Sequence, residues 1–156
     1  MKLTILWPGK TRDRRLAGMI EEYLEKIRRY CKLDVMEIRE EGRSSGTVPR
    51  ARIEKEGRKI LKACRPGEMR VALDERGKEM TSEEFAAFLG RALERTPAGV
   101  KLIIGGPYGL SNEVMKESEH RWALSKLTLT HETARLVALD QVYRAFTIMK
   151  GEPYHH

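Results

Sequence analysis

The feature that most constrains the fold is a regular alternation of strand-like and helix-like segments. Runs of apolar and β-branched residues that are typical of strands occur five times, at residues 2–7, 33–38, 69–74, 100–106 and 122–130. The segments between and after them carry apolar residues at spacings of three and four, or helix-start signals, which predict helices. Strands that alternate with helices predict an α/β fold with a mainly parallel sheet and helices on both faces.

Local signals place several boundaries of these elements. Thr81 and Glu84 have the spacing of a capping box, which predicts a helix that begins directly after Thr81. The last helix is expected from about Glu132 to Lys150, because Gly151 suits the C-terminal cap and Pro153 cannot continue a helix. The segment REEGRSSGTVPR, residues 39–50, is rich in glycine, serine and charge, and is expected to be a mobile loop.

Length and composition narrow the class of protein. A chain of 156 residues is expected to form a single domain, residues 1–156, around one core. Cys31 and Cys64 form no C-x-x-C pair, and we expect a reduced cytoplasmic protein with no secretory leader and no membrane span. The 30 Lys and Arg against 23 Asp and Glu give a net charge of +7, which favours an anionic partner such as nucleic acid.

The stretch LIIGGPYGLS, residues 102–111, joins a strand end, a glycine-rich turn and a helix start at Ser111. Ligands of parallel sheets bind outside the carboxyl ends of strands, so this turn is a candidate ligand site. A ligand held by backbone amide and carbonyl groups suits such a turn. Gly105, Gly106 and Gly109 would equally serve a tight turn that needs positive φ, and the residues alone leave both interpretations open.

Three segments partly match familiar motifs but lack residues that each motif requires. Pro8-Gly9-Lys10-Thr11 resembles the end of a P-loop, but the first glycine of that motif would fall at Thr4, inside the first strand. His131-Glu132 resembles the start of the zinc motif H-E-x-x-H, but the fifth position is Arg135. Gly105-Gly106-Pro107 does not fit the dinucleotide fingerprint G-x-G-x-x-G. Nucleotide, zinc and dinucleotide sites are therefore not expected, and no metal is predicted.

Four segments taken together resemble one known family. They are LDERGKEM (73–80), LIIGGPYGLS, LSKLTLTHETARLVALDQVYRAF (124–146) and GEPYHH (151–156). This set is similar to the SPOUT-class methyltransferases of the ribosomal RNA large subunit methyltransferase H family, and the resemblance covers essentially the whole chain. It implies a C-terminal trefoil knot, S-adenosylmethionine bound in a bent form by the knot loops, and an active site completed across a homodimer.

The resemblance also assigns residues to the cofactor. Leu73 and Asp74 end the third strand at the cofactor, and Gly106 lies in the second loop. The third loop follows the fifth strand and comprises Ser125, Lys126, Leu127, Thr128, Leu129 and Thr130. The family usually has proline where this chain has Thr130, and either residue suits the start of a helix.

Arg144, Tyr154 and His155 are the catalytic residues that the resemblance implies. Arg144 lies in the segment YRAF, where a cation would stabilise the developing imide anion, although a structural ion pair within the dimer is an alternative role. Tyr154 and His155 would position the base or relay its proton. The family has a basic residue where this chain ends with His156, which is mostly uncharged at neutral pH with an ordinary pKa.

The implied activity is methylation of N3 of a pseudouridine in 23S ribosomal RNA, on the assembled ribosome. Two alternatives remain at this stage. A non-enzymatic RNA-binding module would explain the positive charge and Arg39, Arg43, Arg50 and Arg52, but not the glycine turn or the tail. A SPOUT methyltransferase that acts on transfer RNA is the nearest alternative among enzymes.

Overall fold

The computed structural model describes residues 1–41 and 49–153, and in that part of the chain strands and helices alternate as predicted. The strands are β1 (Lys2–Pro8), β2 (Lys32–Ile38), β3 (Met69–Glu79), β4 (Val100–Ile103) and β5 (His120–Ala123). The helices are α1 (Arg14–Arg28), α2 (Pro49–Lys62), α3 (Ser82–Arg95), α4 (Asn112–Lys116) and α5 (His131–Met149). Most of the loop expected over residues 39–50 lies outside the described residues, but its last two residues, Pro49 and Arg50, begin α2, because proline is well suited to the first turn of a helix.

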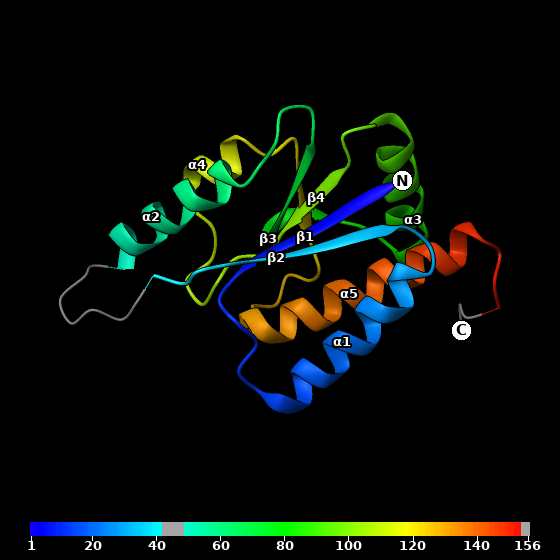
Figure 1. The fold of residues 1–156 in the computed structure, drawn as a ribbon, viewed down its shortest axis with the longest axis horizontal. Coiled ribbons are helices and arrows are strands. Elements are labelled where there is room, and N and C mark those ends of the chain that lie inside the picture. The colour runs from blue at the N-terminus through cyan, green and yellow to red at the C-terminus, as the bar shows by residue number, and fades with distance from the viewer. Residues whose placement is uncertain (42–48, 154–156) are drawn as a thin grey trace.

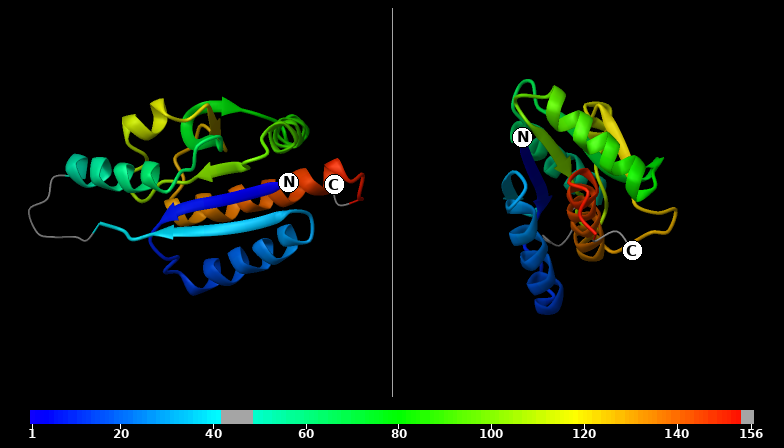
Figure 2. Two further views of the ribbon diagram at one scale, coloured as in Figure 1. Left: turned by 45° about the horizontal axis from the view of Figure 1, so that its top comes forward. Right: turned by 90° about the vertical axis from the view of Figure 1, so that its right-hand side faces the viewer.

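The five strands form one parallel sheet in the order β2-β1-β4-β3-β5. Helices α1, α3 and α5 cover one face, where α5 lies between α1 and α3, and α2 and α4 cover the other (Figures 1 and 2). The predicted α/β class, with helices on both faces of a parallel sheet, is confirmed. None of the helices in residues 1–41 and 49–153 has the length and apolar character needed to cross a bilayer.

The pleat of β1 divides the core into two parts. Leu3, Ile5 and Trp7 pack in the larger cluster with α1, α3 and α5, while Leu6 faces the smaller cluster with Ile60 of α2. Successive side chains of a strand point to opposite faces, so one short apolar strand contributes to both layers. All four of these β1 residues are buried, which places β1 at the centre of the molecule.

The predicted helix boundaries are set by caps that the structure contains. The Thr81 amide donates to Glu84 Oε2 over 2.8 Å, and the Glu84 amide donates to Thr81 Oγ1 over 3.1 Å, which completes the capping box. At the end of α5, Gly151 has φ of 66°, and the amides of Gly151 and Glu152 donate to the carbonyls of Ile148 and Thr147. These two bonds form a Schellman motif, for which glycine is the preferred residue.

Three strand boundaries differ from the prediction. The fourth strand was expected over residues 100–106, but β4 ends at Ile103, where the glycine turn begins to leave the sheet. The fifth strand was expected over residues 122–130, but β5 ends at Ala123 and residues 124–130 form a loop. Ser125 Oγ accepts a hydrogen bond from the Leu127 amide, a local bond that competes with strand pairing. β3 is longer than the predicted 69–74, because after a shift of register its residues up to Glu79 pair again with β5.

The connections after β3 and β4 leave the sheet in opposite directions. β3 is followed by α3 on one face, whereas β4 is followed by α4 on the other (Figure 1). Adjacent parallel strands whose connections diverge leave a crevice at their carboxyl ends, where open α/β sheets bind ligands. The fold therefore places the most favourable ligand position beyond Leu73 of β3 and Ile103 of β4.

Candidate active site at the carboxyl ends of β3, β4 and β5

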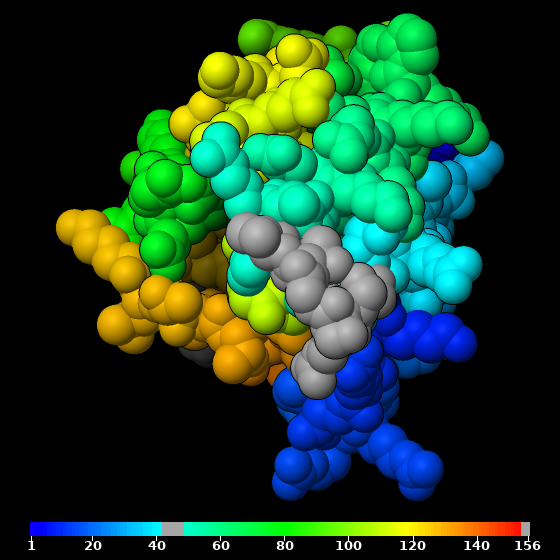
Figure 3. Space-filling model, turned by 90° about the vertical axis from the view of Figure 1, so that its left-hand side faces the viewer, coloured from blue at the N-terminus to red at the C-terminus, as the bar shows by residue number. Residues whose placement is uncertain are grey.

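A cavity of about 670 Å³ lies at this position. It is lined by residues 73–76 of β3, at the shift of register in this strand, by residues 104–110 after β4 and by residues 124–130 after β5 except Lys126, together with the first turn of α5. Figure 3 looks onto this edge of the molecule and shows the surface hollowed between the green, yellow-green and orange segments. The volume is in the range of small-molecule sites, which measure about 300–1,000 Å³.

The cavity brings together almost all the residues that the resemblance assigns to the cofactor. Those that line it are Leu73, Asp74, Gly106, Ser125, Leu127, Thr128, Leu129 and Thr130. Lys126 is the exception among the nine, because its side chain is exposed and does not line the cavity. The three segments are far apart in the sequence, so only the parallel order of the strands makes them neighbours.

The glycine turn after β4 depends on close packing at two positions and on positive φ at a third. A Cβ atom on Gly105 would lie 2.8 Å from the carbonyl carbon of Gly109, and one on Gly106 would lie 3.3 Å from both Glu56 Oε1 and Pro8 Cγ. Gly109 alone in this turn has positive φ, 79°. The two interpretations that the sequence left open thus apply to different glycines. Gly109 serves the turn through its positive φ. Gly106 exposes its backbone to the cavity, and Pro8 and Glu56 lie on its other side.

The segment after β5 is ordered by its own hydroxyl groups. Thr128 Oγ1 donates to Glu75 Oε2 over 2.7 Å, which joins this loop to β3. Thr130 is the N-cap of α5 and its Oγ1 accepts a hydrogen bond from the Thr133 amide, as a residue at a helix start should. Asp74, at the opposite wall, forms an ion pair with Arg76 at 3.1 Å.

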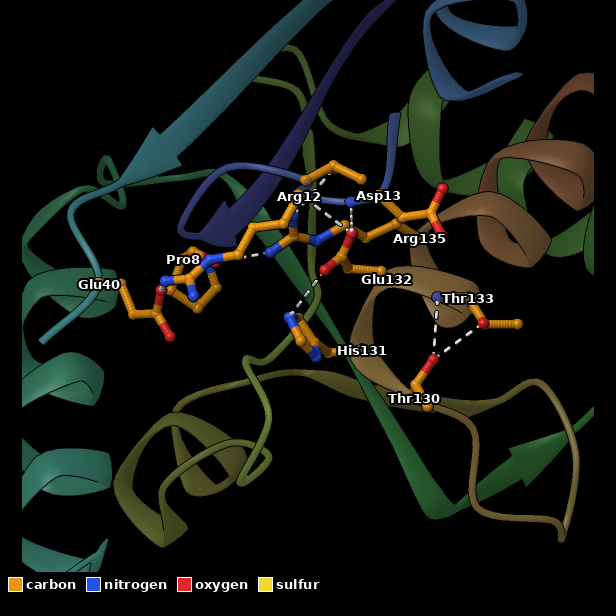
Figure 4. A network of polar contacts seen from close by, with 10 residues as sticks. Pro8, Arg12, Asp13, Glu40, Thr130, His131, Glu132, Thr133 and Arg135 are labelled. Atoms are coloured by element: carbon orange, nitrogen blue, oxygen red, sulfur yellow. Dashed lines mark hydrogen bonds and ion pairs between the residues drawn. The ribbon is translucent and has the colours of Figure 1, made fainter. Parts of the chain in front are cut away.

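The floor of the cavity is held by a polar network between the start of α5 and the turn after β1 (Figure 4). Arg135 is fully buried and donates to the Pro8 carbonyl over 2.6 Å and to Thr11 Oγ1 over 3.0 Å. Glu132 Oε1 accepts hydrogen bonds from the backbone amides of Arg12 and Asp13 at 2.8 and 3.0 Å. The first turn of α5, which lines the cavity, is therefore fixed to the central strand β1.

Two titratable groups next to the cavity have shifted pKa values. Burial raises the pKa of Glu56 to about 7, and the negative charge of Glu40 adds to the shift. Burial lowers the pKa of His131, and the positive charge of Arg135 acts in the same direction. Both shifts favour the neutral form of these two groups.

Sequence reasoning missed several residues of this site. Tyr108, His131 and Ala134 line the cavity, and Glu56 of α2 lies directly behind the glycine turn. His131 and Ala134 are three positions apart at the start of a helix, and this spacing could have indicated that they face the same ligand. The sequence around Glu56 does not indicate that this residue lies behind the glycine turn, because only the tertiary fold brings α2 to that turn.

The incomplete motifs have structural roles in this fold. Thr11 accepts a hydrogen bond from Arg135, and Lys10 is exposed beside a tight turn at Gly9 that has φ of 76°. His131 and Glu132 begin α5, as expected when the zinc motif is incomplete. Within residues 1–41 and 49–153, no three His, Cys, Asp or Glu side chains are grouped so that they could hold a metal ion.

Comparison with known proteins decides the family. A family model described as predicted SPOUT methyltransferase matches residues 1–155. The chain belongs to the SPOUT methyltransferase family. A ribosomal RNA large subunit methyltransferase H from Geobacter metallireducens is 42% identical over 156 residues, which cover 100% of this chain and 99% of the relative. A protein of the same name from Clostridium kluyveri is 39% identical over 158 residues, 99% of each chain.

Two solved structures share the fold of this methyltransferase. A probable rRNA-methyltransferase from Porphyromonas gingivalis superposes with a TM-score of 0.56 at 17% identity, over 95% of this chain and 69% of that one. A probable methyltransferase from Bordetella pertussis gives a TM-score of 0.54 at 15% identity, over 92% and 95% of the two chains. Likeness at this identity supports the α/β architecture of this SPOUT methyltransferase.

Arg144, one of the three predicted catalytic residues of this SPOUT methyltransferase, does not line the cavity of its own chain. Arg144 is half-buried on α5, and ten residues separate it from Ala134, which lines the cavity. At 1.5 Å per residue this spacing corresponds to about 15 Å along the helix. Tyr154 and His155 lie outside the described residues, but Glu152, just before them, accepts a hydrogen bond from Tyr30 at 2.6 Å, at the end of α5 distant from the cavity.

Proposed function

We propose that this protein transfers a methyl group from S-adenosylmethionine to N3 of a pseudouridine in 23S ribosomal RNA, acting on the assembled ribosome. The observation that supports this most strongly is the single cavity at the ends of β3, β4 and β5. Every residue that the family resemblance assigns to the cofactor, apart from Lys126, lines it. Relatives about 40% identical over the whole chain carry the name ribosomal RNA large subunit methyltransferase H.

The residues of the cavity fit S-adenosylmethionine. Gly105 and Gly106 expose backbone without side chains on the cavity wall, while Leu73, Leu129 and Ala134 offer apolar surface for an adenine ring and a thioether chain. Asp74 adds a carboxylate at the strand end, where hydroxyl or amino groups of a ligand could donate to it. S-adenosylmethionine, when bound, supplies the methyl group as an activated sulfonium substituent.

The chain's own groups must prepare the acceptor. N3 of pseudouridine is an imide nitrogen that loses its proton during the reaction, so a nearby cation that stabilises the anion lowers the barrier. We assign this role to Arg144, and we assign positioning of the base and relay of its proton to Tyr154 and His155. Since Arg144 is about 15 Å along α5 from the cavity of its own chain, these groups would have to come from a second subunit.

The proposal therefore includes a homodimer in the cytoplasm, with a C-terminal trefoil knot as the resemblance implies. Two identical chains related by a twofold axis contain two equivalent composite sites, each built from the cavity of one chain and the end of α5 of the other. The net charge of +7 would favour association with RNA, and the contacts to phosphate should make this association strongly dependent on salt.

The test uses the purified full chain with ribosomes from a strain that lacks the endogenous enzyme. Radiolabelled methyl groups should be transferred to 23S RNA, and mass spectrometry of the digested RNA should place them on N3 of a pseudouridine. Calorimetry should show binding of S-adenosylmethionine to the protein alone. Binding to RNA without binding to the cofactor would contradict the proposal in favour of an RNA-binding module, and methylation of transfer RNA but not of ribosomes would contradict the proposed substrate.

A further inference from the structure

A second cavity of about 480 Å³ lies along the edge of the sheet, between α3 and the edge strand β5. It is separate from the candidate active site but adjoins it across the two outermost strands. Trp122 and Lys78 line this edge groove, and Leu124 and Arg76, two residues away on the same segments, line the active-site cavity. A ligand that leaves the mouth of the active site along β5 therefore enters the edge groove.

The edge groove carries an excess of positive charge. Lys78 and Arg91 lie on its wall and take part in no ion pair within residues 1–41 and 49–153. Arg121 also contributes to the wall, but its guanidinium donates to the carbonyl of Met115 in α4, on the other face of the sheet, so its charge lies away from the groove. The single acidic side chain on the wall, Glu84, is bound by the Thr81 amide in the capping box.

Aromatic rings accompany these cations. Phe88 of α3 is half-buried and His120 of β5 is exposed, and their ring centroids are 4.9 Å apart with the planes at 78°. A flat ring beside unpaired lysine and arginine side chains is the combination by which proteins bind single-stranded RNA, since bases stack on the rings and phosphates contact the cations. A groove built to bind an apolar peptide would not leave two cations unpaired on its wall.

We propose that the edge groove binds the single-stranded RNA next to the target nucleotide, with phosphates at Lys78 and Arg91 and a base against His120. This inference rests on the proposed function, because it takes the substrate to be RNA whose target base enters the active-site cavity. The strand would run from that cavity along β5. The four residues of β5 span about 10 Å, enough for one or two nucleotides beyond the target.

The test compares the double variant Lys78→Ala, Arg91→Ala with the wild type in steady-state methylation of ribosomes. Its KM for ribosomes should rise roughly threefold to tenfold with kcat nearly unchanged, because the lost contacts act in binding. The slope of log kcat/KM against log salt should become shallower by about 1.4, which is two phosphate contacts to a single strand. Affinity for S-adenosylmethionine and the melting temperature should stay at their wild-type values.

A matched control removes the same two charges elsewhere. Arg58 and Lys62 are exposed on α2, which covers the other face of the sheet, and the double variant Arg58→Ala, Lys62→Ala should leave KM and the salt slope nearly unchanged. The variant His120→Ala should raise KM without changing the salt slope, since stacking involves no counterion release.

The possible outcomes distinguish failure of the groove proposal from failure of the proposed function. If the wild type methylates ribosomes and the Lys78 and Arg91 variant keeps the wild-type KM and slope, or changes no more than the control, the groove does not bind substrate RNA and the proposed function stands. If the wild type methylates no ribosomal RNA and does not bind S-adenosylmethionine, the proposed function and this inference are both wrong.

Discussion

At the scale of single residues, the glycine turn after β4 depends on two contacts behind it. Gly106 faces the cavity with its backbone, and the direction in which its Cβ would point is filled by Pro8 and the Glu56 carboxylate at 3.3 Å. Contacts of this length are tighter than ordinary van der Waals contacts, so a larger residue requires that a neighbour or the turn itself moves. The rigid proline ring cannot give way, although the Glu56 side chain can rotate.

We expect Gly106→Val to weaken binding of S-adenosylmethionine by on the order of tenfold or more, since overpacking costs about 1–3 kcal/mol and would displace the turn into the cavity. Gly106→Ala should have an intermediate effect. Lys10→Ala changes an exposed residue outside the cavity and should bind the cofactor as the wild type does. Calorimetry provides the measurement, and the reverse order of effects would place the ligand at the Gly9-Lys10-Thr11 turn instead.

Glu56 gives the protein a specific dependence of stability on pH. Its pKa is about 7 in the folded protein, mainly because of burial, against an ordinary value near 4.5. Folding thus favours protonated Glu56. The stability that depends on this proton is fully present below about pH 4.5 and is lost as the pH rises through 7. Glu56→Gln cannot ionise, so between pH 5 and pH 8 the wild type should lose roughly 1–3 kcal/mol of unfolding free energy relative to the variant.

Urea denaturation of both proteins at pH 5 and pH 8 measures this difference. The groups that face Glu56 include Arg52 and Lys59, whose charges oppose the shift, and Glu40 and Glu41, whose charges strengthen it. Parallel pH profiles for Glu56→Gln and the wild type would mean that Glu56 keeps an ordinary pKa.

At the scale of elements, helix caps and strand positions could be predicted from the sequence, but strand ends could not. Thr81, Glu84 and Gly151 act through bonds to residues within four positions, so their pattern is visible locally. β5 ends at Ala123 although apolar and hydroxyl residues continue to Thr130, because only β3 pairs with it. No local pattern reveals where a neighbouring strand stops pairing.

The same distinction applies to the candidate site. Its glycine turn and third loop were identified from motifs, because each is a continuous stretch of sequence. Glu56 and the contact of Arg135 with Pro8 were not, because they join residues from distant parts of the chain. The knotted chain path that the resemblance implies likewise has no signature in strand or helix propensity.

The link between α5 and α1 can be tested at Glu132. Its Oε1 accepts hydrogen bonds from the amides of Arg12 and Asp13, where α1 begins. Glu132→Ala should lower the unfolding free energy by roughly 1–3 kcal/mol, because two donors lose a charged acceptor. Glu132→Gln retains an acceptor oxygen and should lose less. Thermal and urea denaturation measure both variants, and equal stability of all three proteins would show that water replaces the carboxylate without cost.

At the scale of the whole molecule, the two ends of α5 have different functions. Its first turn lines the cavity, while its last turn leads to the C-terminal tail at the other end of the sheet (Figure 2). Ala134 and Met149 are about 22 Å apart along the helix. The last described residues, up to Pro153, therefore follow the end of α5 that is distant from the cavity of the same chain.

Deletion of residues 154–156 should leave folding, dimerisation and cofactor affinity intact, because the Schellman motif and the bond between Tyr30 and Glu152 lie before the deletion. Methyl transfer should fall by about two orders of magnitude or more, since positioning groups act mainly in the transition state. His156→Arg should maintain or raise activity, because it restores a permanent positive charge. A deletion variant that methylates ribosomes at the wild-type rate would exclude a catalytic role for Tyr154 and His155.

The composite site makes a specific prediction about mixed dimers. Arg144 and the tail belong to the same end of α5, so both should serve the cavity of the partner chain. Gly106→Val and Arg144→Ala impair different halves of the site, and a dimer of one chain of each contains one site with an intact cavity and an intact Arg144. Random exchange of subunits should therefore restore about a quarter of wild-type activity from two nearly inactive proteins.

A mixture of Arg144→Ala with the tail-deleted chain should restore none, because each of its sites lacks one of the two groups. Methylation assays after co-refolding, with the dimer verified by sedimentation, distinguish these cases, and an active monomer or the opposite pattern of rescue would show that each chain completes its own site.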